Sequence, residues 1–164
     1  WVNGQASDAL SVLKDVPPEY AWRQFFTSSV YASLGRYGEA ANAIQASPAG
    51  VFFPGTVEDA AGLLRTAPKA SASPRTLPRL GYLAFVYLHV GAPSRVLEVY
   101  EECVEAGYSV PAAVSFLWHH SYAPVRQTER FKAFARKAGL VEYWRSKGWP
   151  DLCHRTTGDE FVCD

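Results

Sequence analysis

Two parts of the chain repeat the same residue types at the same two offsets, and this repetition constrains the fold more than any other feature. Tyr31 is followed by a glycine four residues later and by an alanine nine residues later, and Tyr87 is followed by a glycine and a valine at the same distances. The periodicity around both tyrosines is helical. The pattern predicts two copies of a helical hairpin, in which the glycine forms the turn and the small residue lets the second helix approach the first closely.

The predicted second helix of this hairpin recurs four times along the chain. Its copies are ALSVLKDVP, AANAIQASP, AAGLLRTAP and VLEVYEECV, and the first three have alanine, an aliphatic residue and proline at steps of four. The copies begin at Ala9, Ala40, Ala60 and Val96, and the interval from Ala40 to Ala60 is too short for a full helical pair. We therefore expect a degenerate repeat or an inserted helix near residues 57–67, followed by a flexible linker, PKASASP.

These hairpins are similar to the tetratricopeptide repeat, whose pattern runs W-x2-L-G-x2-Y…A-x3-F…P. The resemblance covers residues 21–48 and 77–104, and the first copy departs from it at Thr27, the leucine position, and at Ser28, the small position before the tyrosine. The resemblance implies an all-α fold of helical hairpins in a short right-handed superhelix. We expect residues 1–109 to hold a partial repeat, one full repeat, the inserted helix and a second full repeat.

The C-terminal tail, EYWRSKGWPDLCHRTTGDEFVCD, is polar yet holds aromatic residues that are unfavourable to expose. It resembles the ending GLVEYWRSKGWPDLC…FVC of bacterial tetratricopeptide proteins attached to winged-helix regulators or adenylate cyclases. A repeat array needs a terminal unit over its last apolar face. We therefore expect residues 110–164 to form a helical cap that completes a single compact unit, with Trp144, Trp149 and Phe161 as the cover. The segment EFVCD is a weak strand candidate.

The three cysteines are Cys103, Cys153 and Cys163, and Cys103 falls on an apolar helix stripe that predicts a buried thiol. Cys153 and Cys163 enclose nine residues, and a disulfide between them would stabilise the fold by about 2–3 kcal/mol on the chain-entropy model. Zinc is the alternative, with His154 as a further ligand, but the cysteine spacing is wider than zinc sites usually have. We prefer the disulfide and expect no metal or other cofactor, and a metal-dependent module or enzyme accessory domain is the alternative.

The sequence contains no recognisable catalytic constellation, so we expect a protein that is not an enzyme. Gly91 stands without the glycine spacing and lysine of a phosphate loop, and no serine lies in a nucleophile elbow. The helix EVYEECVEAG carries four glutamates, which could form paired carboxylates for acid–base chemistry or a solvated acidic face. We favour the solvated face because apolar residues occupy the stripe between the glutamates.

The resemblance implies a ligand groove lined by the first helix of each hairpin. The corresponding residues are Trp22, Phe25, Ser29, Phe85 and His89. Exposed aromatic side chains in such a groove would be good anchors for a protein or peptide segment. The same aromatic residues could instead belong to the core, with the inserted helix or the tail filling the groove, and the sequence leaves both interpretations open.

Charge and hydropathy limit the classes of partner. Sixteen basic residues balance sixteen acidic ones, so we expect neither nucleic acid nor an anionic membrane as a partner of this chain. No apolar run reaches the roughly 18 residues of a membrane span. The chain begins with Trp1 and lacks methionine, from which we expect a fragment of a longer protein.

Together these features predict a non-catalytic interaction or sensory module of a bacterial signalling or regulatory protein, which binds a protein or peptide segment. A structural spacer or a dimerisation domain, with a second copy of the chain as partner, is a further alternative. In the proteins that the chain resembles, a membrane segment often separates the repeats from the signalling domain. This implies a periplasmic or other extracytoplasmic location, which the predicted disulfide would fit, and a cytoplasmic location stays open.

Overall fold

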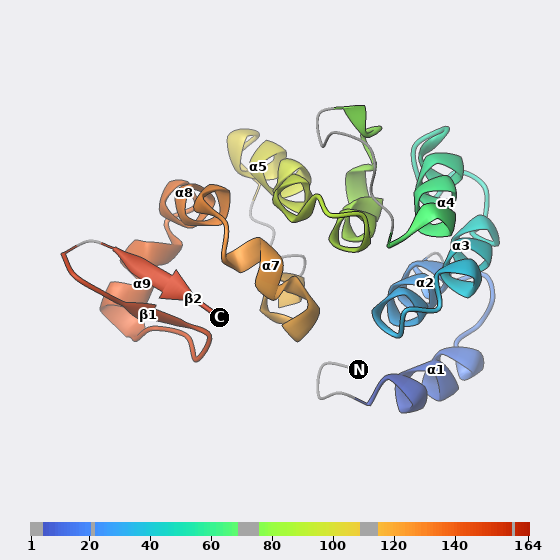
Figure 1. The fold of residues 1–164 in the computed structure, drawn as a ribbon, viewed down its shortest axis with the longest axis horizontal. Helices are drawn as coiled ribbons and strands as arrows, with labels where there is room; N and C mark the ends of the chain where they lie inside the picture. The colour runs from blue at the N-terminus through green and yellow to red at the C-terminus, as the bar shows by residue number, and fades with distance from the viewer. Residues whose placement is uncertain (1–4, 21, 69–75, 109–114, 159) are drawn as a thin grey trace. The chain divides into compact units, whose positions relative to one another are not determined.

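The computed structural model describes residues 5–20, 22–68, 76–108, 115–158 and 160–164. Its contacts divide the chain into two compact units, Trp1–Ala92 and Pro93–Asp164. Both are built mostly of helices, and the described sheet is one pair of short strands (Figure 1). The prediction of an all-α fold is confirmed at this level, whereas the right-handed superhelix stays a prediction. No described helix is long and apolar enough to cross a membrane.

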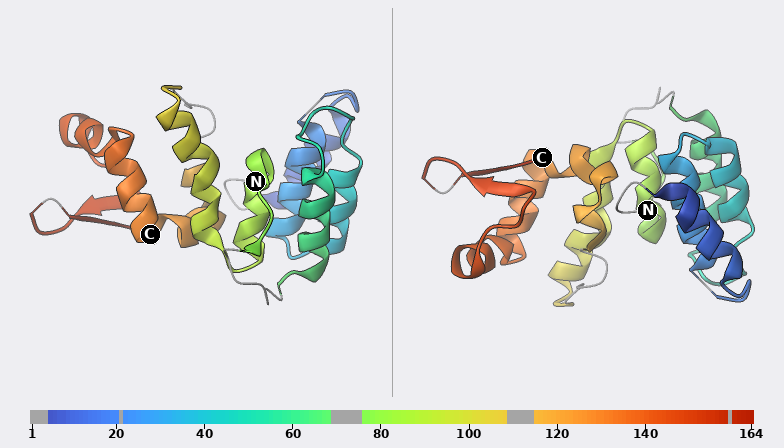
Figure 2. Two further views of the ribbon diagram at one scale, coloured as in Figure 1. Left: turned by 90° about the horizontal axis from the view of Figure 1, so that it is seen from above. Right: turned by 90° about the horizontal axis from the view of Figure 1, so that it is seen from below.

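The first unit is built around three helices that pack in chain order. Its described elements are α1 (Ala6–Asp15), α2 (Arg23–Ser33), α3 (Tyr37–Gln45), α4 (Thr56–Thr66) and the 3-10 helix η2 (Gly81–His89). Helix α3 packs against both α2 and α4, and the three lie side by side in Figure 2. The contact faces are rich in alanine, and Ala40 and Ala60 are fully buried. These small side chains let the helices approach closely, as the sequence predicted for Ala40.

In both copies of the repeat, the glycine four residues after the tyrosine lies at the C-terminal end of a helix. After α2, Gly35 has φ +72°, and the N–H of Arg36 donates to the carbonyl oxygen of Tyr31 at 2.9 Å. After η2, the next glycine also has φ +72°, and the N–H of Ala92 donates to the carbonyl oxygen of Tyr87 at 3.0 Å. Both ends have the hydrogen bond of a Schellman cap, which favours glycine because it needs a left-handed residue.

The boundary between the two units lies within the second predicted hairpin, residues 77–104. Its first helix is η2, and its second consists of the 3-10 helix η3 (Pro93–Leu97) followed by α5 (Glu98–Glu105). The contacts thus divide the chain at residue 92, whereas the sequence analysis placed the end of the repeat region at residue 109. The second repeat and the cap boundary stay predictions.

The helix predicted near residues 57–67 is α4, which packs against α3 and η2; whether it is a degenerate repeat or an insertion stays open. Its Arg65 reaches α3, where Nη2 donates to Asn42 Oδ1 at 3.2 Å. The linker predicted after it lies mostly outside the described residues.

The second unit begins with η3 and α5 and ends in a strand hairpin. The other described elements are η4 (Ser115–Trp118), η5 (His120–Tyr122), α7 (Ala123–Arg126), α8 (Glu129–Lys137), α9 (Leu140–Lys147), β1 (Cys153–Arg155) and β2 (Phe161–Cys163). The strands are antiparallel, and Cys153 lies opposite Cys163. The weak strand candidate EFVCD therefore contains β2, and its partner β1 has no strand pattern of its own.

A buried arginine joins the helices of the second unit to its last residue. The Nη1 atom of Arg126 donates to the carbonyl oxygens of Leu117 and His119 at 2.6 and 2.9 Å, and its Nε atom donates to that of Asp164 at 2.8 Å. Burial lowers the pKa of Arg126 from its ordinary value. The side chain stays charged nonetheless, because an arginine is not deprotonated in proteins, and the three carbonyl oxygens solvate the charge.

Candidate functional site

An aromatic cluster in the first unit connects its core to its surface. The ring of Trp22 lies 5.6 Å from Phe25, 5.8 Å from Phe52 and 5.6 Å from Tyr82, measured between centroids, and all three pairs are edge-to-face. Phe25 is buried, Trp22 and Phe52 are half-buried, and Tyr82 is 50% exposed. Edge-to-face pairs add favourable energy beyond the area they bury, so the exposed ring is held in place through Trp22.

A hollow of about 390 Å³ lies beside this cluster. It is lined by Gly50, Val51, Phe52, Phe53, Pro54, Thr56, Leu80 and Tyr82. None of the lining residues that the structure describes is charged. Phe53 and Tyr82 are 68% and 50% exposed, which is unusual for large apolar side chains. We refer to this feature as the aromatic hollow.

Two segments that are distant in sequence form the aromatic hollow: the loop between α3 and α4, and the start of η2. The loop is held at Phe53, whose carbonyl oxygen accepts hydrogen bonds from the N–H of Thr56 at 3.1 Å and from its Oγ1 at 2.7 Å. The ring of Phe53 rests against Gly81, which has φ +52°, and Cδ2 lies 3.6 Å from the position of a Cβ built on that glycine. The absence of a side chain at Gly81 thus gives the ring a flat surface.

One hydrogen-bond donor in the lining of the aromatic hollow is the hydroxyl of Tyr82. This hydroxyl makes no hydrogen bond to the part of the chain that the structure describes, whereas Trp22 packs against Phe52 and Tyr82 without lining the hollow. Tyrosine is common in binding surfaces because it combines a large apolar body with one polar atom. The Tyr82 hydroxyl is therefore available to a ligand.

Of the five predicted groove residues, the structure buries three and leaves two half-buried. Phe25, Ser29 and Phe85 are buried: Ser29 Oγ donates to the carbonyl oxygen of Phe25 at 2.9 Å, and the rings of Phe25 and Phe85 lie 5.4 Å apart. Their burial favours the core interpretation for these three. Trp22 and His89 are half-buried, and a ligand-binding role stays a prediction for both.

His89 packs against the start of α3. Its ring lies 5.6 Å from that of Tyr37, and burial lowers the pKa of His89 to about 4. The imidazole is therefore neutral at neutral pH, and it is suited to an apolar contact rather than to a charged one.

The sequence analysis did not select Phe52, Phe53 or Tyr82. A signal for the first two existed in the loop segment VFFPG, where two aromatic residues precede a proline and a glycine between helices. Loop residues seldom contribute large side chains to a core, so this pair could have been assigned to the surface. Tyr82 has no such signal, because it lies in the apolar run GYLAFVYLHV.

The sulfur atoms of Cys153 and Cys163 lie 2.02 Å apart, at the distance of a disulfide bond, whereas Cys103 is a half-buried free thiol. This pair supports the disulfide over the zinc alternative, because a disulfide removes both thiolate ligands. His154 is exposed on β1. Within the described residues, no group of three or more His, Cys, Asp and Glu side chains is placed to hold a metal ion.

The predicted cover of the tail forms a second aromatic cluster. Trp144 and Phe161 are buried, and their ring centroids lie 5.7 Å apart. Trp149 lies 5.5 Å from Trp144 and 5.6 Å from Phe161, and the guanidinium of Arg136 lies 5.5 Å from the Phe161 ring. These contacts explain why a polar tail carries such residues: their rings pack against one another and against α9. The role of the tail as a cap on the repeats stays a prediction.

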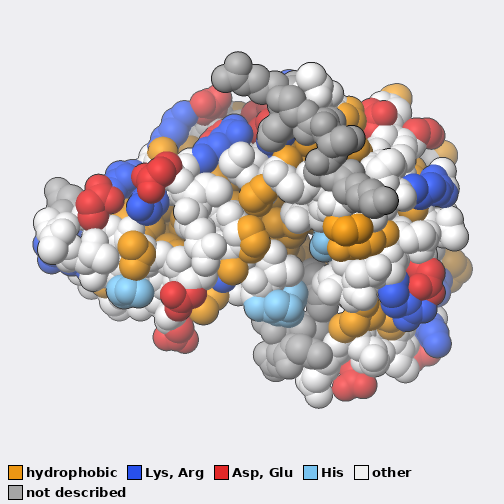
Figure 3. All heavy atoms as spheres, viewed as in Figure 1, with side chains coloured by type: hydrophobic (Ala, Val, Ile, Leu, Met, Phe, Trp, Pro, Cys, Tyr) orange, Lys and Arg blue, Asp and Glu red, His pale blue; other side chains and the backbone are white. Residues whose placement is uncertain are grey.

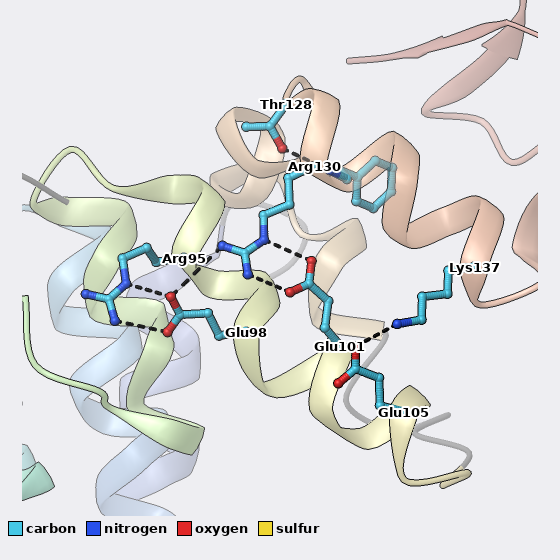
Figure 4. A network of polar contacts seen from close by, with 8 residues as sticks. Arg95, Glu98, Glu101, Glu105, Thr128, Arg130 and Lys137 are labelled. Carbon is cyan, nitrogen blue, oxygen red and sulfur yellow. Dashed lines mark hydrogen bonds and ion pairs between the residues drawn. The ribbon is translucent and has the colours of Figure 1, made fainter. Parts of the chain in front are cut away.

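The acidic helix α5 is solvated in part: Glu102 and Glu105 are exposed, whereas Glu98 and Glu101 are half-buried. Figure 4 shows that Arg130 of α8 pairs with Glu101, with its Nε and Nη2 atoms 2.9 and 2.5 Å from the two carboxylate oxygens. Glu98 pairs with the buried Arg95 of η3 at 2.7 and 3.0 Å, and Glu105 lies 2.6 Å from Lys137 of α8. The pairs with Arg130 and Lys137 join α5 to α8, and the pair with Arg95 joins α5 to η3, so these contacts favour a structural role for the paired glutamates.

Charges of both signs are interspersed on the face of the molecule seen in Figure 3, where Lys and Arg side chains lie next to Asp and Glu. This agrees with the balanced composition. The chain was compared with protein-family models, curated proteins and solved structures, and none of them matches it.

Proposed function

We propose that this chain is a non-catalytic binding domain, built from tetratricopeptide-like hairpins, that holds a segment of another protein in the aromatic hollow. The observation that carries the proposal is the exposure of Phe53 and Tyr82 around one hollow in the first unit. Grouped and exposed apolar side chains mark interaction sites in soluble proteins.

The composition of the aromatic hollow favours a peptide over a charged metabolite. The lining residues within the described ranges carry no charge, so a phosphate or carboxylate group would lose hydration there without gaining a charged partner among them. Aromatic residues supply most of the binding energy in many protein interfaces, because they bury a large area while losing few rotamers. The hydroxyl of Tyr82 adds a donor for a backbone carbonyl group.

The wider setting is part of the same proposal. The chain would be the interaction or sensory part of a bacterial signalling or regulatory protein, as its resemblance to tetratricopeptide proteins implies. The bonding distance between Cys153 and Cys163 supports an extracytoplasmic location, because disulfides persist in oxidising compartments.

A phage-displayed library of random peptides tests this function. The library is selected on the immobilised chain, and recovered peptides are then compared on the wild type and on the double variant Phe53→Ala/Tyr82→Ala. Both side chains are largely exposed, so the variant should fold. We expect recovered peptides to lose about tenfold or more in affinity for the double variant.

The control is Tyr143→Ala on α9. Tyr143 is a similarly exposed aromatic residue, at 60%, and its replacement should leave peptide binding unchanged. Failure to recover peptides, or equal binding to the double variant, would contradict the proposal.

A further inference from the structure

We propose that the segment held in the aromatic hollow is extended, uncharged and rich in proline. This inference rests on the proposed function and adds the chemistry of the partner. Three features of the aromatic hollow carry it: the electrostatics of its rings, the hydroxyl donor of Tyr82, and its small size.

Electrostatic complementarity is the first feature. An aromatic ring has a negative face, and the C–H groups beside the nitrogen of a proline ring are polarised positively. The exposed rings of Phe53 and Tyr82 therefore attract a proline ring without any formal charge. The described residues that line the aromatic hollow offer no counter-ion, so a lysine or glutamate side chain would be disfavoured at the same place.

Hydrogen bonding is the second feature. Tyr82 presents a hydroxyl donor that the described part of the chain leaves unused. Each proline in a peptide contributes a carbonyl acceptor but no N–H donor. A proline-rich segment can therefore accept from Tyr82 while bringing few donors of its own, which would otherwise lose water as the segment binds.

Size and preorganisation are the third feature. A volume of about 390 Å³ lies at the small end of the range for ligand sites. A hollow of this size suits a few residues of an extended segment better than the face of a whole helix. A polyproline II helix is extended before it binds, so it loses little conformational entropy in a shallow aromatic site.

The test uses three synthetic peptides of about ten residues with blocked ends: polyproline, a glycine–serine peptide and a leucine-containing peptide without proline. Binding to the isotope-labelled chain is followed by amide chemical shifts. We expect polyproline to shift the amides of Gly50, Val51, Gly81 and Tyr82, and the glycine–serine peptide to shift none. We expect Phe53→Ala to weaken polyproline binding by about tenfold and Tyr82→Phe, which removes only the hydroxyl, by about two- to tenfold. Tyr143→Ala should not change it.

The outcomes separate this inference from the proposed function. If the leucine peptide shifts these amides and polyproline does not, the proline inference is wrong while the aromatic hollow stands as a peptide site. If polyproline binds equally to the wild type and to Phe53→Ala, it binds elsewhere and the inference is wrong. If no synthetic peptide binds and the library selection also yields none, both proposals are overturned.

Discussion

The hydroxyl of Ser28 on α2 donates a hydrogen bond to the carbonyl oxygen of Ala40 on α3 at 2.8 Å, and both residues are fully buried. Ser28 occupies the position where the repeat pattern has a small residue, and Ala40 is the small residue of the second helix. The bond shows how closely the two helices approach. It also accounts for a polar residue at this point in the core, because a buried hydroxyl needs a partner.

We expect substitutions at Ser28 to destabilise the first unit. Ser28→Ala removes one hydrogen bond and should lower the free energy of unfolding by about 0.5–1.5 kcal/mol. Ser28→Leu should lower it further, by about 1–3 kcal/mol from overpacking alone, because the larger side chain would push α2 and α3 apart. Urea unfolding followed by far-ultraviolet circular dichroism measures both. Ser146→Ala, which removes an exposed bond to the carbonyl oxygen of Tyr143, is the control. A Ser28→Leu variant as stable as the wild type would contradict the close contact.

The ion pair between Arg130 and Glu101 should stabilise the second unit more than an exposed pair does. Arg130→Ala leaves Glu101 and its neighbour Glu98 partly buried without this cation, and we expect a loss of about 1 kcal/mol in the free energy of unfolding. Arg36 and Glu39 form an ion pair on the surface. Arg36→Ala is the matched control, and it should leave the free energy of unfolding unchanged within experimental error. Equal effects of the two substitutions would argue against a structural role for Arg130.

Stability should depend on pH through His89. Its pKa is lowered to about 4 in the folded state, whereas an unfolded histidine titrates near 6.5. Between about pH 4 and pH 6.5, His89 is therefore protonated in the unfolded chain but neutral in the folded chain. Stability should fall as pH falls from about 6.5 to 4, by up to about 1.4 kcal/mol per pH unit from this group.

Urea unfolding of the wild type and of His89→Gln at several pH values tests this expectation. The variant should show a shallower dependence in the window from about 4 to 6.5, whatever its stability at neutral pH. Parallel curves for wild type and His89→Gln would refute the role of His89.

The pairing of Cys153 with Cys163 predicts the number of free thiols. Alkylation of the denatured, non-reduced chain from an oxidising compartment should modify one thiol, that of Cys103, and the variant Cys103→Ser should show none. Mass spectrometry counts them, and three modified thiols would contradict the pairing. Replacing both Cys153 and Cys163 by alanine should lower the free energy of unfolding by about 2–3 kcal/mol, because the bond closes a short loop in the unfolded chain.

Local features of this protein could be predicted from the sequence. The turn after Tyr31 and the one after Tyr87 depend on a glycine within a few residues, so the offset alone predicts the ends of α2 and η2. Helix α4 follows from its own periodicity. Cys153 and Cys163 are close in sequence, and a short loop brings them together readily.

Tertiary structure decided which of the aromatic residues are buried and which are exposed. The sequence allowed Phe25 and Phe85 to line a groove or to belong to the core. In the structure they pack against each other and both are buried in the core. Phe53 and Tyr82 are far apart in the chain, and the fold brings both into the lining of the aromatic hollow. The ion pair between Arg130 and Glu101 likewise joins two separate helices. Periodicity and turn chemistry act over a few residues, whereas exposure depends on which distant segment packs against a side chain, and only the folded chain determines that.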